Sequence, residues 1–452
     1  MRFAPHTTDD ITAMLDVVGQ PDLDALFSHI PEELRVDGPL QLPQGRSEDE
    51  VLRVARDFAS RNDTDAVCFA GGGAYDHHVP SLIGALISRG ELLTAYTPYQ
   101  PEVSQGMLQA LFEYQTVISE LTGLPISNAS LYDGGSAVAE AVSMACAATR
   151  RNRVVLAQSL DAPSREVART YGHPLGRRFD EAPTDAASGT TPVIAVDDDV
   201  AAVVVQQPNA LGVIEDVRAW AQATHASGAM LIVKLDPLAT GLLARPGDQG
   251  ADIVIGEGQT LGQGLSYGGP AFGFLACRDD QVRRLPGRVV GQTVDAEGTR
   301  GYVMTLRARE QDIRREKATS NICTNQTLNA VAALIYLSWL GPEGLAQLAH
   351  DCFARAQHAV ARLTAVPGVT TAVEGPWWRE FPLKLDVPDP HEVIRALAGE
   401  GFLIGPVVPD GPAAGAVLIA LTERRTAEEV EALAVALERV VSESQRRIAG
   451  AA

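Results

Sequence analysis

The chain has 452 residues, of which 46% are hydrophobic, and a formal net charge of −20 at pH 7. A chain of this length and composition can bury the cores of two or three domains. Its negative charge disfavours nucleic acid and anionic membranes as partners, because like charges repel. The longest apolar run, Ala330 to Trp339, is shorter than the roughly 20 residues of a membrane span. The first residues carry no apolar signal segment, which predicts a cytoplasmic protein.

Residues 1–65 predict a helical N-terminal arm without a sheet of its own. Thr7 to Asp10 has the composition of a helix N-cap, and Ser47 to Glu50 opens a second helix in the same way. Apolar residues at helical spacing follow each cap. Such an arm must bury its apolar faces on the body of the chain or on a partner subunit.

Three glycines, Gly71 to Gly73, follow a short apolar strand at 66–70. They fit a tight turn, and a phosphate cradle is the alternative. The adjacent His77 and His78 would diverge by about 100° on a helix. We therefore expect no metal site there.

The segment Tyr96 to Glu102 places aromatic and polar side chains between prolines. Proline excludes a helix and stiffens the loop, so Tyr96, Tyr99, Gln100 and Glu102 are candidate residues of a pocket wall or a subunit interface. Packing within the chain is the alternative interpretation.

A glycine-rich turn, Gly134-Gly135-Ser136, opens an apolar helix. Backbone N–H groups at a helix start point outward beside the positive end of the helix dipole and favour an anion. These three residues are candidates for a phosphate pocket, and an ordinary N-cap loop is the alternative.

From residue 153 onward, apolar strands alternate with helices, which predicts a mainly parallel sheet covered on both faces. We expect a large α/β domain over residues 66–325 and a small C-terminal α/β domain over residues 326–452. The basic stretch from Arg300 to Lys317 is predicted to be helical. A long apolar helix should follow and stop at Gly341-Pro342.

One strand of the large domain ends at Asp236, and a later strand ends in a turn that carries Gln259. This layout is typical of pyridoxal phosphate (PLP) enzymes of the aspartate aminotransferase type, fold type I. There the acid faces the pyridine nitrogen and the turn offers a lysine as Schiff base. An amide cannot form an imine, so Gln259 leaves the chain without that lysine. The chain has three lysines, Lys234, Lys317 and Lys384.

Several stretches resemble glycine decarboxylase, the P-protein of the glycine cleavage system. The resemblance is closer still to the alpha subunit (subunit 1) of its two-gene bacterial form, and it extends over nearly the whole chain. The matching stretches are residues 74–79, 94–106, 127–136, 256–273, 307–310 and 314–326.

The resemblance implies a function in an assembly. In this family a second subunit carries the PLP lysine, decarboxylates glycine and passes the aminomethyl group to the lipoyl arm of H-protein. This chain would pair with that subunit in an α2β2 heterotetramer and bind no PLP covalently. Asp236 and Gln259 would be relics of a cofactor pocket.

Two alternatives remain open on sequence grounds. The chain could be a stand-alone PLP enzyme using Lys234 or Lys317, or a non-catalytic scaffold on the same fold. Lys234 lies two residues before Asp236, so both side chains point to the same face of their strand.

Overall fold

A computed structural model describes residues 5–36, 38, 40–95 and 97–451. The chain divides into two compact units, Met1–Thr64 and Asp65–Ala452. No helix in the described residues is long and apolar enough to cross a membrane.

In its described residues the first unit holds two α-helices, both with the predicted caps. The helix α1 (Thr8–Val18) begins at a capping box between Thr7 and Asp10, and α2 (Glu48–Ala59) begins at one between Ser47 and Glu50. Two short 3-10 helices lie between them, η1 (Asp24–Phe27) and η2 (Glu32–Leu34). Neither α-helix has a buried residue.

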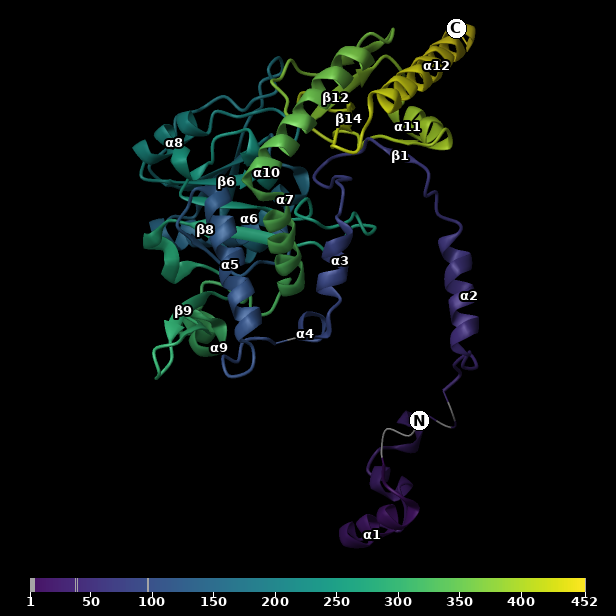
Figure 1. Ribbon diagram of the computed structural model, residues 1–452, viewed down its shortest axis with the longest axis vertical. Coiled ribbons are helices and arrows are strands. Elements are labelled where there is room, and N and C mark those ends of the chain that lie inside the picture. The colour runs from purple at the N-terminus through teal and green to yellow at the C-terminus, as the bar shows by residue number, and fades with distance from the viewer. Residues whose placement is uncertain (1–4, 37, 39, 96, 452) are drawn as a thin grey trace. The chain divides into compact units, whose positions relative to one another are not determined.

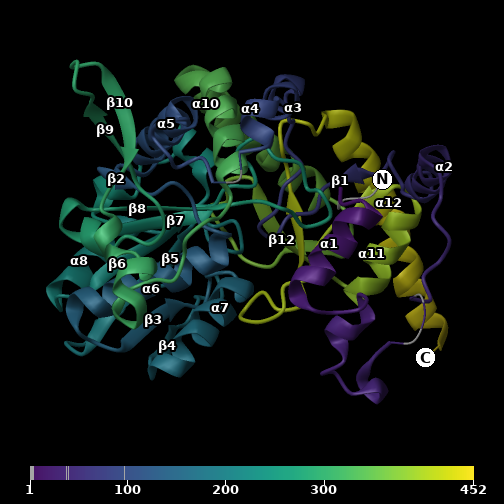
Figure 2. The same cartoon turned by 90° about the horizontal axis from the view of Figure 1, so that it is seen from below.

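The second unit is built around a seven-stranded sheet, visible edge-on in Figure 2. Its strand order is β2-β8-β7-β6-β5-β3-β4. The five strands from β7 to β4 pair in parallel, and β8 and β2 add antiparallel pairs at one edge. The bounds are β2 (Ile126–Ser127), β3 (Arg153–Ala157), β4 (Arg178–Ala182), β5 (Val200–Gln207), β6 (Met230–Leu235), β7 (Ile253–Glu257) and β8 (Gly273–Cys277).

Helices cover both faces of this sheet, as the continuous apolar strands predict. Along β5, Val203 packs in one core cluster and Val204 in the other, because successive side chains point to opposite faces. The first cluster also holds residues of α5 (Gln105–Thr122), α8 (Val217–Ala226) and α10 (Thr327–Leu363). The second holds residues of α6 (Gly134–Thr149) and α7 (Ala162–Gly172).

The C-terminal part forms a smaller antiparallel sheet, β11-β12-β14. The helix α10 leads into it and is interrupted at Gly341, whose φ of 64° is outside the helical range. This is where the sequence predicts a stop. The elements are β11 (Val369–Thr371), β12 (Glu380–Leu385), α11 (Pro390–Gly399), β13 (Phe402–Leu403), β14 (Val417–Ala420) and α12 (Ala427–Ala451). The strand β1 (Val67–Cys68) pairs in parallel with β13.

The predicted helix from Arg300 to Lys317 is wrong over its first residues. Arg300–Met304 is strand β10, which pairs antiparallel with β9 (Val290–Val294) in the hairpin that projects beyond α5 in Figure 2. Tyr302 is buried there and packs beside Phe112 of α5, so tertiary packing favours the strand. Short helical turns follow: η7 (Arg307–Arg309), α9 (Gln311–Arg314) and η8 (Arg315–Lys317).

The remaining short helices join the larger elements (Figure 1). They are α3 (Ser81–Ile87), α4 (Gly90–Leu93), η3 (His173–Leu175), η4 (Pro237–Gly241), η5 (Gly247–Gln249) and η6 (Asp279–Arg284).

Candidate functional site

A cavity of about 300 Å³ lies at the carboxyl ends of the parallel strands. Ligand sites of open α/β sheets form at this edge. Its walls come from the residues that follow β3 and β6, from the glycine loop after β1, from the start of β12 and from the loop 406–412. The large sheet and the small sheet therefore both contribute to it.

Lys234 of β6 and Asp236, directly after that strand, both line this cavity, as their spacing predicts. Lys234 Nζ forms an ion pair with Asp161 and donates to Ser164 Oγ at 2.8 Å. Asp236 forms an ion pair with Arg379. Each side chain is thus held by an opposite charge.

Gln259 is 6% exposed and follows the end of β7. Its Oε1 accepts from the Tyr75 backbone N–H at 3.0 Å, and its Nε2 donates to the carbonyls of Tyr75 at 3.2 Å and Gln263 at 2.8 Å. The amide therefore clamps the loop after β1 onto the turn after β7. It does not line the cavity, but its partner Tyr75 does.

The start of α6 is occupied by carboxylates of the chain. The Gly134 N–H donates to Glu257 Oε2 at 2.8 Å, and the Ser136 N–H donates to Asp133 Oδ1 at 2.7 Å. A Cβ on Gly134 would lie 3.0 Å from the Cβ of Glu257, so glycine permits this approach. Burial raises the pKa of Glu257. Gly135 lies between the two capped residues, beside Val167.

Several polar residues of the cavity are not among the sequence-based candidates, and Tyr75, Arg379 and Glu380 contact one another there. The Arg379 guanidinium carbon lies 3.6 Å from the centre of the Tyr75 ring. Glu380 accepts from the Gly72 N–H at 2.6 Å and from the Tyr75 hydroxyl at 2.9 Å. Burial raises the pKa of Glu380 to about 7. The adjacent charges of Arg379 and Glu380 at the start of an apolar strand are the signal that could have marked them.

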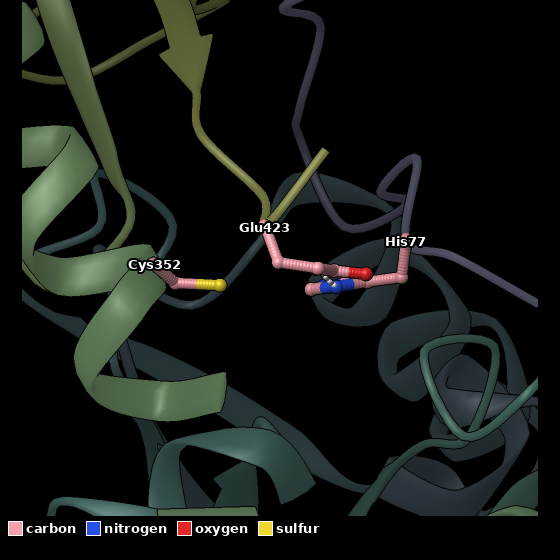
Figure 3. Close-up of side chains that lie close together, drawn as sticks. All are labelled: His77, Cys352 and Glu423. Carbon is pink, nitrogen blue, oxygen red and sulfur yellow. Dashed lines mark hydrogen bonds and ion pairs between the residues drawn. The ribbon is translucent and has the colours of Figure 1, made fainter. Parts of the chain in front are cut away.

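Figure 3 shows a second polar cluster, formed by His77, Cys352 and Glu423. One possible ligand atom from each lies within 4.8 Å of the others. His77 Nδ1 contacts Glu423 Oε2 at 2.6 Å, and Arg379 contacts the other ring nitrogen of His77. Burial raises the pKa of the Cys352 thiol to about 12. Because both imidazole nitrogens are engaged and the thiol is protonated at neutral pH, the cluster is poorly prepared for a metal ion.

The predicted pocket-wall loop lies apart from the described lining of the cavity. Tyr96 is outside the described residues. Tyr99 is half-buried, its hydroxyl lies 3.4 Å from Thr327 Oγ1, and Arg288 lies 5.3 Å from its ring centre. Gln100 and Glu102 are exposed. Tyr99 is therefore anchored within the chain while its polar neighbours face outward.

The family profile described as glycine cleavage system P-protein matches residues 1–437. The chain belongs to the glycine cleavage system P-protein family. A probable glycine dehydrogenase (decarboxylating) subunit 1 of Desulforamulus reducens is 47% identical to it over 445 residues, which are 97% of this chain and 99% of the relative. The family predicted from sequence is confirmed.

Solved structures confirm the predicted fold of this P-protein family member. A crystal structure of glycine decarboxylase (P-protein) of the glycine cleavage system, in inhibitor-bound form, is 46% identical with a TM-score of 0.90, covering 97% of this chain and 100% of that one. A sphingosine-1-phosphate lyase of Burkholderia pseudomallei has a TM-score of 0.68 at 18% identity over 93% of this chain and 96% of its own, which shows the fold alone. The fold is that of fold type I PLP-dependent enzymes.

Proposed function

We propose that this chain is the alpha subunit of a glycine dehydrogenase (decarboxylating) and holds no pyridoxal phosphate of its own. The observation that carries the proposal is Gln259. Its amide is buried and all its hydrogen bonds go to the backbone of Tyr75 and Gln263. A lysine is required at this turn for an imine with the cofactor, and this chain has none there.

Two other positions that hold PLP in this fold, the start of α6 for its phosphate and Asp236 for its pyridine nitrogen, also do not fit it. The Glu257 carboxylate lies on the first N–H of α6, so a phosphate there would meet a like charge. Asp236 already pairs with Arg379. No step of the reaction is therefore assigned to a cofactor in this chain.

The catalytic group belongs, in this proposal, to a second subunit that carries the lysine. PLP bound there supplies the electron sink for decarboxylation of glycine, and the aminomethyl group passes to lipoyl H-protein. This chain pairs with that subunit, in an α2β2 assembly, and helps to shape its pocket. The exposed polar residues Gln100 and Glu102, beside Tyr96 and Tyr99, are the candidates for that contact.

The decisive experiment is reconstitution. Glycine decarboxylation, followed as bicarbonate exchange into glycine, should require this chain, its lysine-bearing partner and lipoylated H-protein together. Each component is omitted in turn as the control. Full activity from the partner and H-protein without this chain would refute the proposal.

The alternative of a stand-alone PLP enzyme has a separate test. The purified chain is mixed with PLP, reduced with borohydride and mapped by peptide analysis. We expect no stoichiometric adduct, because Lys234 is ion-paired with Asp161. A stoichiometric adduct on Lys234 or Lys317 would favour that alternative. Co-purification with a lysine-bearing PLP chain distinguishes the proposal from a scaffold outside glycine cleavage.

A further inference from the structure

We propose that this chain occupies its cofactor anchors with its own side chains: Glu257 takes the phosphate position at the start of α6, and Arg379 takes the pyridine-nitrogen position on Asp236. This inference rests on the proposed function, because it explains what keeps the subunit free of cofactor. It goes further in making the exclusion of the cofactor independent of the residue at position 259.

The first anchor is the N-terminus of α6. Helix N-termini bind anions through free N–H groups and the positive end of the dipole. Here the Gly134 N–H donates to Glu257 Oε2 at 2.8 Å, and Asp133 takes the N–H of Ser136. Glu257 comes from the end of β7, two residues before Gln259. The strand that lacks the lysine thus also supplies the anion that replaces a phosphate.

The second anchor is Asp236 at the end of β6. In PLP enzymes an acid at this position pairs with the protonated pyridine nitrogen. Arg379 is 2% exposed and provides a permanent cation for Asp236 instead. Its guanidinium stacks against Tyr75, whose backbone Gln259 holds. The cation is therefore fixed in place by the same loop that Gln259 clamps.

At both positions the group that would bind the cofactor, the N–H of Gly134 or the carboxylate of Asp236, already has a charged partner from this chain. A phosphate would have to displace a carboxylate, and a pyridinium would have to displace a buried guanidinium. Removing one partner of a buried ion pair is costly. The self-occupied anchors therefore exclude PLP even where a lysine is restored at position 259.

The test measures binding of phosphate to the purified full chain, by titration calorimetry and by ³¹P nuclear magnetic resonance. We expect Glu257→Ala to bind inorganic phosphate at least tenfold more tightly than the unmodified chain, which corresponds to about 1.4 kcal/mol. Glu257→Gln removes the charge but keeps the volume, so it should show a smaller gain. Glu140→Ala is the matched control, because Glu140 is also a buried carboxylate, on α6 itself. Its phosphate affinity should equal that of the unmodified chain.

The second anchor is tested in the Glu257→Ala background. Pyridoxal phosphate should bind no more tightly than inorganic phosphate, because Arg379 still holds Asp236, and unphosphorylated pyridoxal should not bind. Much tighter binding of pyridoxal phosphate would overturn the role of Arg379. If Glu257→Ala or Glu257→Gln keeps its native circular dichroism yet gains no phosphate affinity over Glu140→Ala, the role of Glu257 is refuted. These readouts are independent of activity, so they stand apart from the reconstitution experiment.

Discussion

The Arg379 guanidinium carbon lies 3.6 Å from the centre of the Tyr75 ring, and the hydroxyl of the same tyrosine donates to Glu380 at 2.9 Å. The Tyr75 backbone is bound in turn by Gln259. One residue of the loop after β1 therefore connects the turn after β7 with the start of β12. These contacts of Tyr75 fix the position of the cavity wall between the two sheets.

Gln259→Leu should destabilise the folded chain by about 2 kcal/mol. The leucine keeps the volume but leaves the Tyr75 backbone N–H without its acceptor, while the Tyr75 carbonyl keeps the His77 N–H. An unpaired buried polar group costs about 1–3 kcal/mol. Urea unfolding followed by circular dichroism measures the change. Gln292→Leu, at an exposed position of β9, is the control and should change stability by less than about 0.5 kcal/mol. Equal urea midpoints for Gln259→Leu and Gln292→Leu would show that the hydrogen bonds of Gln259 to Tyr75 do not stabilise the fold.

Gln259→Lys should restore neither an imine nor activity in the isolated chain. The new ammonium would lie between the carbonyls of Tyr75 and Gln263, which accept from the amide in the native chain. Hydrogen bonds to a charged amine keep it protonated and unreactive. Absorbance near ~420 nm after addition of PLP reports the imine. A stoichiometric band that borohydride reduction traps at residue 259 would show that this reasoning is wrong.

Lys234→Met should lower the free energy of unfolding by about 3 kcal/mol, because Asp161 would be left as a partly buried carboxylate without its cation. Chemical denaturation at pH 7 measures the loss. Lys384→Met is the matched control, since Lys384 is exposed on β12. The double variant Lys234→Met with Asp161→Asn should recover part of the stability. No recovery would indicate that the ion pair is not the cause.

The raised pKa of Glu380 leads us to expect that stability depends on pH. Burial raises its pKa from 4.5 to about 7 in the folded chain, so the folded state binds the proton more tightly than the unfolded state does. Stability should therefore fall as pH rises from 4.5 to 7, by about 2–3 kcal/mol from this group. Glu380→Gln should reduce that slope, measured by thermal unfolding across pH 4.5–8. Glu297→Gln, on an exposed carboxylate, should leave the slope unchanged.

Tyr99→Phe tests the loop that we assign to the partner's pocket. If the hydroxyl contacts the reacting centre, turnover of the assembled enzyme should fall about 10-fold or more while assembly and melting temperature barely change. Thr327→Val is the control, because it removes the 3.4 Å contact of the hydroxyl within the chain and leaves Tyr99 intact. Loss of the partner on gel filtration before any loss of rate would make Tyr99 an interface anchor instead.

The sequence by itself determined the architecture of the large sheet. Uninterrupted apolar runs such as residues 200–205 of β5 can be buried only between two helical layers, and this local property predicts parallel strands. It also placed a glutamine and not a lysine at position 259, after a buried strand, because residue type needs no tertiary information. Between Arg300 and Lys317 it predicted a helix where the contact of Tyr302 with Phe112 favours a hairpin.

Only the tertiary structure decided how the site is filled. Tyr75 and Glu380 are 305 residues apart, and Asp236 and Arg379 are 143 apart. No local pattern joins them, because their contact depends on how the small sheet packs against the carboxyl edge of the large one. Polar groups this far apart in sequence meet only when the chain folds. Once they are buried, a group without a partner would cost free energy, so each is paired. The sequence therefore showed that residue 259 is a glutamine, and the fold showed which distant side chains meet around the cavity.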